Sequence, residues 1–485
     1  MMRVRSAGLW MAAAMAAVCL AGCSKGGAKT VNLDSNNPVS LTVWHYYNGA
    51  QQATFDTMIQ EFNATVGKEK GIYVEAYSQG SVSDLEKAIQ SSLNQEVGAG
   101  DLPDMFSAYA DMAYTAQQKG ILADLSQYLT KKEQEAYVDS YIDEGYLNND
   151  GALYLLPVAK STEILMVNQT DWEPFAEATG STLDELKTTE GITEVAERYY
   201  NWTDSLTPDI PDDGKAMYGR DSMSNYFIIG MRQMGKEIFE VKDGKVTYNT
   251  DKGLIRRLWD NYYVPYIKGY FAAYGRFRSD DVKTGDVIAY TGSMSSASYF
   301  PDHVETDTEN YPIDCVIQEA PVMKDGSNVR VQQGAGMAVT KSDDAHEYAS
   351  SVFLKWFTQK EQNLRFGCNS GYLPVLKAAN TTKALDETIA SYQIGINDKV
   401  YECLKTVLNE FDQTEFYTPK TFEEGYSARK VLDCSLSDRV AADKKAIDAA
   451  VADGASREKE IKKYLTDEAF EQWYEEFCSA LEQAK

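Results

Sequence analysis

Residues 41–62, LTVWHYYNGAQQATFDTMIQEF, open the part of the chain that decides the fold. The run 41–44 is short and apolar, which is typical of a strand. The residues after it place apolar side chains at positions i, i+3, i+4 and i+7, on one face of a helix: Phe55, Met58, Ile59 and Phe62. The segment therefore predicts a strand followed by an amphipathic helix.

The same order of strand and helix is repeated in the next segments. Residues 72–76 alternate as in a second strand, and Ser83 with Glu86 has the spacing of a capping box at the start of a second helix. Residues 103–106 begin a third strand, and the helix after it is predicted to end at Gly120. Such alternation predicts right-handed crossovers and a mostly parallel sheet, which binds ligands beyond the carboxyl ends of its strands.

The rest of the chain predicts a second α/β region and a helical end. Residues 187–270 are mainly helical in pattern, and 287–290 has the pattern of a strand that a serine-rich turn at 293–298 follows. Residues 329–339 predict another strand, and the chain from Asp386 onward is predicted to form helix after helix. The predicted fold class is therefore α/β.

The composition of the 485 residues fits a globular protein of about two to four domains. Hydrophobic residues make up 44%, enough to form large cores, which excludes a wholly disordered chain. A formal net charge of −26 argues against nucleic-acid binding, because that function needs a basic surface. The 32 tyrosines, beside only 7 tryptophans, supply apolar rings with polar tips that suit sugars and other polar ligands.

Residues 1–22 have the features of an export signal. Two arginines precede an apolar run, 7–20, that is too short to span a bilayer comfortably. The run is followed by Cys23 in the pattern of a bacterial lipobox, so we expect cleavage before this cysteine and lipid on its sulfur. A flexible tether over 23–39 would then hold the protein at the outer face of the bacterial cytoplasmic membrane. An ordinary secretory signal with an incidental cysteine is the alternative.

Motifs of the common catalytic and metal sites are absent from the sequence. The chain has three histidines and no H-E-x-x-H, Walker A, G-x-S-x-G or G-x-G-x-x-G motif. No C-x-x-C pair occurs, so we expect no metal and no cofactor. The pairing of the remaining cysteines stays open: Cys315, Cys368, Cys403, Cys434 and Cys478. The many carboxylates leave a surface glycoside hydrolase as an alternative, although no single pair is selected.

Five segments, in their order and spacing, resemble the family 1 extracellular solute-binding proteins of ABC importers. They are Leu41–Phe62, Leu102–Leu129, Gly151–Asn168, Val331–Thr340 and Phe353–Val375. Together they span nearly the whole chain after the leader. Within that family the chain looks nearest to the carbohydrate and glycerol-phosphate binders, at residues 44–45, 274–276, 293–298 and 371–374.

The resemblance implies a fold like that of the periplasmic binding proteins, with two α/β lobes, hinge crossings and a ligand cleft between the lobes. The N-terminal lobe would comprise about 40–156 with 314–360, and the C-terminal lobe about 157–313 with 361–485. Closure would be a hinge motion driven by tighter binding of the ligand to the closed form. The implied protein is a monomer and not an enzyme, and its partners are the transmembrane permease subunits of an ABC importer.

Five candidate ligand-binding residues belong to the first predicted strand ends and to a late loop: Tyr47, Asn48, Tyr109, Asp111 and Tyr372. Tyr47 can stack on a sugar face, and Asn48 and Asp111 can bond hydroxyl groups. The structural alternatives are a packed ring and helix caps. Tyr372 lies in a Gly-Tyr-Leu-Pro segment that in the family often borders the cleft. We therefore expect Tyr372→Ala to weaken ligand binding without unfolding the protein.

Nine further candidates come from the crossings, the serine-rich turn and a second-lobe helix: Ser161, Glu163, Asp221, Ser222, Asn225, Ser293, Ser295, Gln333 and Gly334. The two serines at 293 and 295 lie between strand and helix, where free backbone N–H groups favour anions or hydroxyls, with helix capping as the alternative. Glu163 would be close to both lobes or part of the hinge. Gly334 would let a ligand approach the backbone closely.

Two departures from the glycerol-phosphate binders favour a neutral or amine-bearing carbohydrate, a mono- or oligosaccharide, as the ligand. Where those proteins are expected to have an aromatic pair, this chain has Ser222 and Asn225. Where they have a late arginine for the phosphate, it has residues 421–424, Thr-Phe-Glu-Glu, with no basic side chain. Arg220 is the residue that could replace that charge.

Other ligands of the same family stay open as alternatives, namely glycerol phosphates, polyamines and iron. Iron binders of the family use adjacent tyrosines, and such pairs occur at 199–200 and 262–263, both within predicted helices. The sequence does not identify the sugar or the permease, because the specificity of a binding site depends on its geometry in three dimensions.

Overall fold

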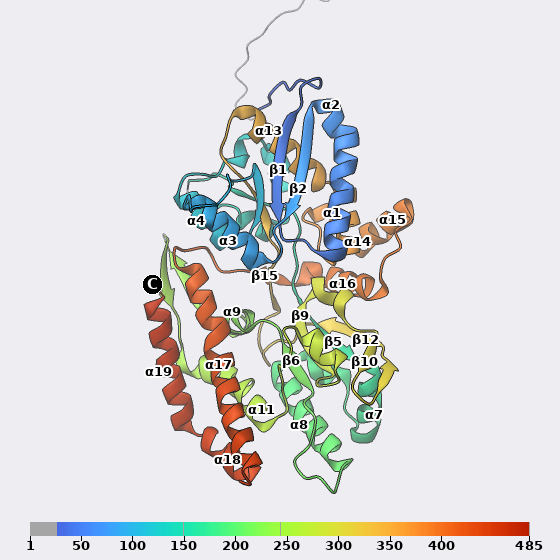
Figure 1. Cartoon of the computed structure of the whole chain (residues 1–485), viewed down its shortest axis with the longest axis vertical. Helices are drawn as coiled ribbons and strands as arrows, with labels where there is room; N and C mark the ends of the chain where they lie inside the picture. The colour runs from blue at the N-terminus through green and yellow to red at the C-terminus, as the bar shows by residue number, and fades with distance from the viewer. Residues whose placement is uncertain (1–26, 149, 243, 485) are drawn as a thin grey trace, which may run out of the picture.

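Two α/β lobes lie one above the other along the longest axis of the molecule (Figure 1). The computed structural model describes residues 27–148, 150–242 and 244–484. The N-lobe, which contains the first strands, is uppermost in Figure 1, and the C-lobe, which contains the last helices, lies below it. The chain passes between the lobes more than once, so each lobe combines segments that are distant in the sequence.

The N-lobe sheet has the strand order β2-β1-β3-β14-β4. Its strands are β1 (Val39–His45), β2 (Ile72–Ser78), β3 (Met105–Ala108), β4 (Leu155–Pro157) and β14 (Gly336–Val339). β1 is parallel to both β2 and β3, as the alternation of strands and helices predicts. β14 is antiparallel to β3 and β4, so a late segment of the chain completes the sheet.

Helices cover this sheet with the side chains that the apolar periodicity selects. The main ones are α1 (Gly49–Phe62), α3 (Val82–Leu93), α4 (Ala110–Gln118), α13 (Asp344–Phe357) and α14 (Lys360–Ser370). α1 buries Phe55, Met58, Ile59 and Phe62, the whole of the predicted apolar face. α3 and α4 follow β2 and β3, which places their first turns at the carboxyl ends of parallel strands.

The start of α3 differs from the prediction. The N-cap is Ser81 rather than Ser83: its hydroxyl accepts a hydrogen bond from Asp84 N at 3.2 Å, and the Asp84 carboxylate accepts one from Ser81 N at 3.1 Å. The chain turns at Gly80, whose φ of +96° favours glycine, and Ser81 then takes the extended conformation of a cap. The Glu86 carboxylate is therefore free of any capping role.

The C-lobe sheet has the strand order β12-β5-β9-β6. Its strands are β5 (Glu163–Asn168), β6 (Tyr218–Arg220), β9 (Ala289–Ser293) and β12 (Cys315–Glu319). β5 is antiparallel to both β12 and β9, and β6 is parallel to β9. The predicted strand at 287–290 corresponds to the start of β9, and a 3-10 turn over 294–299 follows it.

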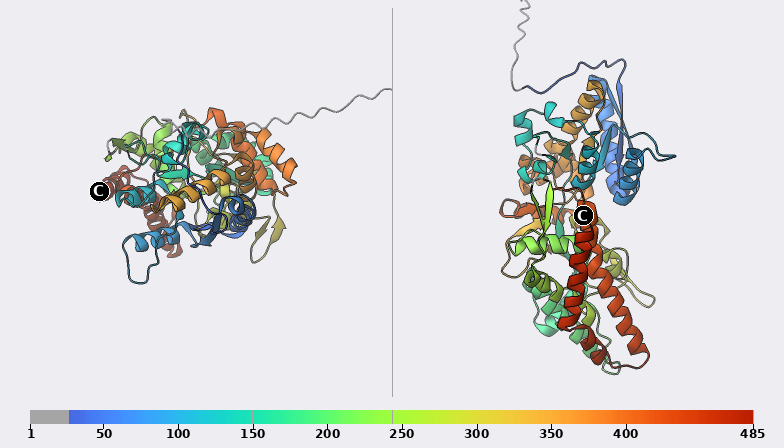
Figure 2. Two further views of the ribbon diagram at one scale, coloured as in Figure 1. Left: turned by 90° about the horizontal axis from the view of Figure 1, so that it is seen from above. Right: turned by 90° about the vertical axis from the view of Figure 1, so that its left-hand side faces the viewer.

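Helices of the C-lobe form two groups. Those from the middle of the chain are α7 (Gln169–Thr179), α8 (Thr189–Ser205), α9 (Met223–Gln233), α10 (Lys252–Asp260), α11 (Tyr263–Lys268) and α12 (Arg278–Lys283). The chain ends in α17 (Gly425–Ala452), α18 (Arg457–Tyr464) and α19 (Asp467–Gln483). α17 packs on α9 and α11, and α19 runs beside it (Figure 2). The charged last helix is docked through Phe470, Trp473, Phe477 and Leu481.

The structure has further helices and further pairs of strands. They are α2 (Lys68–Lys70), α5 (Lys131–Glu135), α6 (Asp139–Asp143), α15 (Thr382–Tyr392), α16 (Asp398–Asn409), and the paired strands β7 (Phe239–Lys242) with β8 (Lys245–Tyr248), β10 (His303–Glu305) with β11 (Asn310–Pro312), and β13 (Val329–Val331) with β15 (Glu415–Tyr417). β13 and β15 are parallel, which brings the segment before α17 close to the second crossing between the lobes, the residues between β13 and β14.

The crossings between the lobes meet in a small hydrogen-bonded region. Ser161, between β4 and β5, pairs with Gln333, which lies between β13 and β14. Lys160 pairs in the same way with Leu373. The Lys160 ammonium is almost fully buried, lies 2.5 Å from Glu144 Oε2, and donates to the carbonyl oxygen of Gly334 at 3.0 Å. These contacts connect separate chain segments at the place where the lobes are joined.

Three segments lie differently from the predicted division of the chain. β12, predicted to begin an N-lobe segment at 314, pairs with β5 and extends the C-lobe sheet. α14, predicted to follow a boundary at 360, packs on α1 of the N-lobe, because Phe366 stacks among the N-lobe aromatic rings. The predicted tether contacts the N-lobe from Lys29, whose backbone N–H donates to Gln127 O at 2.7 Å. Cys23 and the export signal lie outside the described residues.

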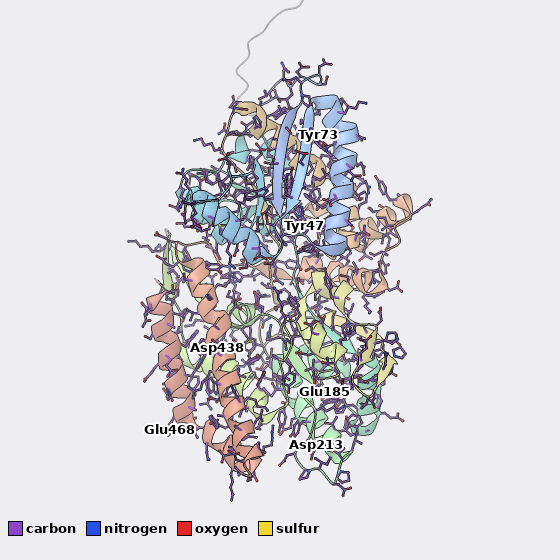
Figure 3. The ribbon with its side chains drawn as sticks, in the orientation of Figure 1. Tyr47, Tyr73, Glu185, Asp213, Asp438 and Glu468 are labelled. Atoms are coloured by element: carbon purple, nitrogen blue, oxygen red, sulfur yellow. The ribbon has the colours of Figure 1, made fainter. Side chains whose placement is uncertain are left out.

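The five cysteines of the described chain are free thiols, and no disulfide joins them. No helix among the described residues is both long enough and apolar enough to cross a membrane. Figure 3 shows Tyr47 at the edge of the N-lobe that faces the other lobe, whereas Tyr73 lies on the upper part of the same lobe.

Candidate functional site

A cavity of about 370 Å³ lies between the two lobes. Its lining comes from the first turns of α3 and α4, from the start of α9, from the second crossing and from the segment before α17: Val82, Ser83, Glu86, Tyr109, Ala110, Asp111, Glu144, Ser222, Ser224, Asn225, Phe239, Val331, Gln332, Gln333, Thr418, Pro419, Lys420, Phe422, Gly425, Tyr426 and Arg429. Both lobes and a crossing therefore contribute, as expected of a ligand cleft.

The N-lobe wall follows from the parallel arrangement of its first strands. Tyr109 directly follows β3 and is the N-cap residue of α4, so Asp111 lies in the first turn of that helix. Glu86 lies in α3, which follows β2. Because parallel strands end at the same edge of a sheet, these two helices present Glu86 and Asp111 to the same cavity.

The pKa values of both carboxylates are raised, with Asp111 as the like charge that acts on Glu86, and Glu144 as the one that acts on Asp111. Burial raises the pKa of Glu86 to about 7, and the nearby Asp111 carboxylate adds to this effect. Burial also raises the pKa of Asp111, against the opposing effect of Arg429, whose Nε lies 3.9 Å from Asp111 Oδ2. Among the described residues Glu86 has neither a hydrogen-bond partner nor an ion-pair partner. The cavity therefore has an acidic side whose charge is only partly compensated.

The C-lobe wall is the start of α9. The Ser222 hydroxyl caps this helix by accepting from Asn225 N at 3.3 Å. The Asn225 amide donates to Glu163 Oε1 at 3.0 Å and to Gln333 Oε1 at 3.4 Å. These bonds orient the amide and fix the Gln333 side chain at the cavity.

Arg220 lies behind this wall and is already neutralised. Its Nη2 donates to Glu163 Oε2 at 3.1 Å, its Nε donates to Ser222 O at 3.3 Å, and its guanidinium lies 4.7 Å from the centre of the Tyr226 ring. It borders a separate space of only about 20 Å³ and does not line the main cavity. The prediction that Arg220 could supply charge for a phosphate is thus not supported by its position.

The floor of the cavity contains buried polar atoms that lack protein partners. Gln332 is 5% exposed, and its Nε2 donates to Glu144 Oε2 at 2.6 Å and to Ser140 O at 2.9 Å. Its Oε1 has no hydrogen-bond partner in the described part of the chain, and neither has Gln333 Nε2. Buried polar atoms are normally paired, so an unpaired acceptor and donor at one cavity indicate groups available to a ligand.

Of the fourteen predicted residues, five line the cavity: Tyr109, Asp111, Ser222, Asn225 and Gln333. The other nine lie around it, and most are engaged in protein contacts. Tyr47 is 1% exposed and packs in an aromatic cluster with Phe55, Phe366 and Tyr372. The Asn48 amide donates to Tyr46 O and Gly80 O at 2.9 and 2.8 Å. Tyr47 thus corresponds to its structural alternative, a packed ring, whereas Asn48 is the N-cap residue of α1 but makes no capping hydrogen bond through its side chain.

The remaining crossing residues also have protein partners. The Ser161 and Ser293 hydroxyls are 2.9 Å apart, and Ser293 and Ser295 are likewise 2.9 Å apart. A Cβ on Gly334 would lie 2.4 Å from Ala159 O, and its φ is +89°. The glycine is therefore needed for close packing of the two crossings, which is a different reason from ligand approach. Glu163 is occupied by Arg220 and Asn225, as described above.

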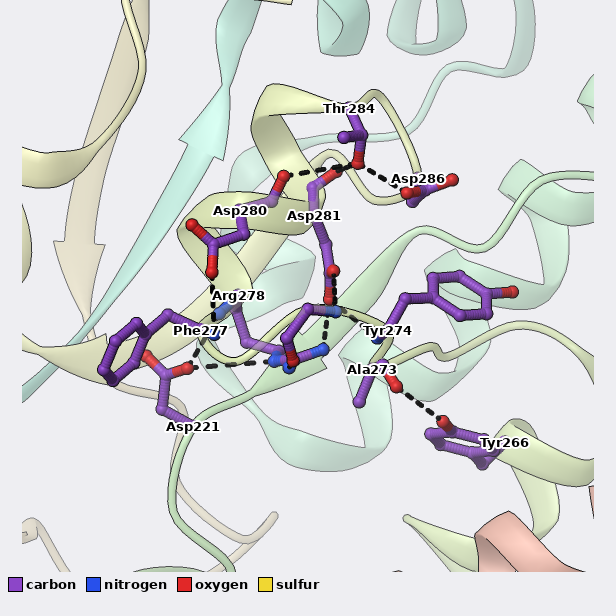
Figure 4. A network of polar contacts seen from close by, with 11 residues as sticks. Asp221, Tyr266, Ala273, Tyr274, Phe277, Arg278, Asp280, Asp281, Thr284 and Asp286 are labelled. Atoms are coloured by element: carbon purple, nitrogen blue, oxygen red, sulfur yellow. Dashed lines mark hydrogen bonds and ion pairs between the residues drawn. The ribbon is translucent and has the colours of Figure 1, made fainter. Parts of the chain in front are cut away.

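Asp221 belongs to a separate polar network at the end of β6 (Figure 4). Its Oδ1 accepts from Arg278 N at 2.9 Å. Arg278 forms an ion pair with Asp281, which in turn accepts from Gly275 N at 2.6 Å and Tyr274 N at 3.1 Å. Burial raises the pKa of Asp221 to about 6. The network fixes the loop before α12, so Asp221 has a positioning role for this loop.

Several lining residues were missed from the sequence. The sequence predicted Glu86 to be part of a capping box, and no sequence pattern indicated that Glu144 lines the cavity. Lys420 and Arg429 flank the segment 421–424 that was searched for a basic residue, so the cavity does have cationic groups there. These residues reach the cavity because β15 pairs with β13, a long-range contact that no local pattern indicates.

The arrangement of the described side chains does not indicate a metal-binding site. In the part of the chain that the structure describes, no group of three or more histidine, cysteine, aspartate or glutamate side chains is placed to hold a metal ion. The tyrosine pairs proposed for iron lie away from the cavity: Tyr199 and Tyr263 are buried in the C-lobe core.

A two-lobed α/β protein with its cavity at the crossing between the lobes belongs to the class of ligand-binding proteins that close about a hinge. The chain belongs to the bacterial extracellular solute-binding protein family, whose sequence profile matches residues 57–392. The predicted family and the predicted periplasmic-binding-protein-like fold are thereby confirmed.

Solved structures with the same fold have low sequence identity to this chain. A cyclic alpha-maltosyl-1,6-maltose binding protein from Arthrobacter globiformis is 20% identical, with a TM-score of 0.62 over 91% of this chain and 99% of that one. UgpB from Mycobacterium tuberculosis in complex with glycerophosphocholine is 16% identical, with a TM-score of 0.64 over 93% and 100%. MalE from Bdellovibrio bacteriovorus, bound to maltotriose, is 14% identical, with a TM-score of 0.59 over 90% and 99%. Comparison with curated protein sequences gives no significant match.

Proposed function

We propose that the protein is the carbohydrate-binding subunit of an ABC importer and that it captures a mono- or oligosaccharide in the cavity between its lobes. The observation that carries this proposal is the lining of that cavity. Aromatic rings of Tyr109, Phe239 and Phe422 lie beside the amides of Asn225 and Gln333. Rings for the apolar faces of a sugar, and amides for its hydroxyl groups, are the chemistry that saccharides require.

A phosphate ester fits this cavity less well. Arg220 is paired with Glu163 behind the wall, and Arg429 faces Asp111. Lys420 is the lining cation with no acidic partner among the described side chains, and three carboxylates share the cavity with it: Glu86, Asp111 and Glu144. A phosphate would approach these carboxylates at an electrostatic cost, whereas hydroxyl or amine donors would be favoured. Glycerol phosphates remain the second candidate because of Lys420.

Capture would occur by hinge closure at the crossings. The lobes are joined where Ser161 pairs with Gln333 and Lys160 with Leu373, and Gln333 also lines the cavity. A ligand that contacts α3 and α4 on one side and α9 on the other binds the closed form more tightly than the open form, and this difference drives closure. The closed, loaded surface would then be recognised by the permease subunits.

The proposed setting is the outer face of a bacterial cytoplasmic membrane. The family is extracellular, and the N-terminal pattern supports removal of residues 1–22 and lipid attachment at Cys23. The protein would act as a monomer that binds and delivers its ligand without converting it.

A thermal-shift screen tests the proposed function. The panel contains neutral sugars, amino sugars, glycerol phosphates, polyamines and ferric citrate. A ligand at 100 times its dissociation constant stabilises the folded protein by about 2.7 kcal/mol, which is readily measured. Stabilisation by a saccharide is the expected result, and stabilisation only by phosphate esters or only by polyamines would overturn the carbohydrate assignment. Release of a chromophore from a chromogenic glycoside would instead support the hydrolase alternative.

A further inference from the structure

The proposed function leaves unexplained why two carboxylates of the cavity lack close partners. Glu86 from α3 and Asp111 from α4 both line the N-lobe wall. Glu86 forms no hydrogen bond and no ion pair with the described residues, and the nearest cation to Asp111 is Arg429, at 3.9 Å. Carboxylates that serve the fold are normally paired when they are taken out of water.

Glu144 provides a comparison within the same cavity. Its Oε2 lies 2.5 Å from the Lys160 ammonium and accepts from Gln332 Nε2 at 2.6 Å. This carboxylate therefore has a positive counter-charge and a close hydrogen bond, and it joins the crossing to the N-lobe. Glu86 has no contact of this kind, and Asp111 has only the 3.9 Å approach of Arg429, so the fold compensates these two charges less completely than that of Glu144.

We propose that the ligand of this cavity carries a protonated amine and that Glu86 and Asp111 hold it. This inference rests on the proposed function, because it specifies the chemistry of the saccharide bound in the same cavity. An ammonium group placed between the two carboxylates compensates both charges at once, which a neutral hydroxyl cannot do. The repulsion that the Asp111 charge exerts on Glu86, described above, is relieved by the same cation.

A second, independent feature points to a donor-rich ligand group. Gln332 is 5% exposed and lines the cavity, and its Oε1 is buried without a hydrogen-bond partner in the described chain. An ammonium group has three N–H donors and no acceptor, so it can serve two carboxylates and a further acceptor together. Glu86, Asp111 and Gln332 Oε1 are acceptors of this kind on one cavity.

Aromatic contacts favour the same chemistry. The Tyr109 ring lines the wall next to Asp111 and stacks on Tyr46 at a centroid distance of 6.4 Å, which fixes its orientation. A cation near a tyrosine face gains further electrostatic attraction. The uncharged part of the saccharide would lie toward Phe239, Phe422 and the exposed Tyr426 on the other side of the cavity.

Calorimetry with matched saccharides tests this inference on the exported full-length protein in detergent. The probes are glucosamine and its oligomers of two and three units, each compared with its N-acetylated form, because acetylation removes the charge and keeps the sugar skeleton. Spermidine is a polyamine cation without a sugar, and glycerophosphocholine is a zwitterion whose quaternary ammonium has no N–H donor. At pH 7 we expect the amine form to bind at least about tenfold more tightly than its acetylated partner, about 1.4 kcal/mol.

Variants then assign the preference to these residues. Glu86→Gln and Asp111→Asn should each remove most of the preference for the amine, because each lowers the affinity for the amine form by more than it changes that for the acetylated form. Glu75→Gln, on an exposed position of β2, is the matched control and should keep the preference. Thermal unfolding of each variant shows that it is folded.

The outcomes separate this inference from the proposed function. Equal affinity for amine and acetylated sugars overturns the amine inference and leaves a carbohydrate binder. Binding of spermidine in place of any sugar, weakened by Glu86→Gln, supports the cation site and overturns the carbohydrate function, whereas binding of glycerophosphocholine alone overturns both. Absence of binding by every amine in the panel, to a protein that unfolds cooperatively, overturns the inference.

Discussion

Asp111 of the N-lobe approaches Gly425 at the start of α17 so closely that a Cβ on this glycine would lie 2.8 Å from Asp111 Oδ1. Both residues line the cavity, and α17 is otherwise part of the C-lobe. The carboxylate therefore lies at the N-terminal end of a long helix of the opposite lobe, where the helix dipole favours negative charge. This contact connects the two walls of the site.

Gly425→Ala should weaken ligand binding without destabilising the protein. The added methyl group would displace the Asp111 carboxylate, which is the end of a movable side chain, and alanine is favoured over glycine in a helix by about 1 kcal/mol. We expect an affinity lower by about tenfold for the ligand identified in the screen, with a free energy of unfolding equal to or above that of the wild type. Calorimetry and urea unfolding measure the two quantities.

The control for this variant is Gly395→Ala. A Cβ on Gly395 has no heavy atom within 4 Å, and the residue lies in a loop away from the cavity lining. Its ligand affinity should match that of the wild type. Equal affinity of Gly425→Ala and the wild type would show that the contact with Asp111 has no part in binding.

Glu86→Gln should change how stability depends on pH. In the folded protein the pKa of Glu86 is raised from an ordinary value of 4.5 to about 7 by burial and by Asp111. The folded state thus binds this proton more strongly than the unfolded state, so stability is lost as pH rises from about 4.5 to about 7. The titratable groups that line the same cavity from neighbouring elements are Tyr109, a neutral phenol, and the charged Asp111, Glu144, Lys420 and Arg429.

The glutamine variant lacks this loss. At pH 8 it should be more stable than the wild type by about 1–3 kcal/mol, and at pH 4 the two should be equally stable. Urea unfolding at both pH values provides the comparison, and a difference that is the same at pH 4 and pH 8 contradicts the expectation. The raised pKa of Asp111 acts in the same direction and remains in the variant, so some loss of stability with pH should persist.

Tyr372→Ala should unfold the protein more readily, which replaces the expectation from the sequence. Tyr372 is 6% exposed, its ring stacks on Phe366 at 6.1 Å and 11°, and its hydroxyl lies 3.5 Å from that of Tyr46. Truncation of a buried aromatic side chain costs about 3–5 kcal/mol. Tyr372→Phe keeps the ring and should cost much less. Urea unfolding that shows no loss for the alanine variant would place Tyr372 outside the core.

The sequence predicted those features that depend on local periodicity. The apolar spacing of α1 and the alternation of β1, β2 and β3 with helices were sufficient to place strand ends at one edge of a parallel sheet. Tyr109 and Asp111 were found for that reason, because they come directly after a buried strand. The family resemblance pointed to Asn225 in the second lobe, and Gln333 was selected as the opening of the late predicted strand.

The other half of the cavity depends on contacts between distant segments. Lys420, Tyr426 and Arg429 reach it through the pairing of β15 with β13, for which the sequence has no periodic signal. Glu86 was concealed by a capping-box spacing that begins two residues after the true cap at Ser81. Tyr47 and Tyr372 have the composition of sugar-stacking residues, but their neighbours Phe55 and Phe366 enclose them, which only the packing reveals.

Removal of the Lys160 charge should strongly destabilise the protein. Lys160 is 1% exposed and forms a buried pair with Glu144 at the crossing between the lobes. Lys160→Met leaves the Glu144 carboxylate buried without its counter-charge, which costs about 3–5 kcal/mol. The double variant Lys160→Met with Glu144→Gln removes both charges, so it should recover most of this loss.

Lys462→Met, which breaks the exposed pair with Glu458, should change stability by less than about 1 kcal/mol. Urea unfolding of all four proteins completes the comparison, and a double variant as unstable as Lys160→Met would mean that Lys160 stabilises the crossing through its bond to Gly334 O rather than through the ion pair.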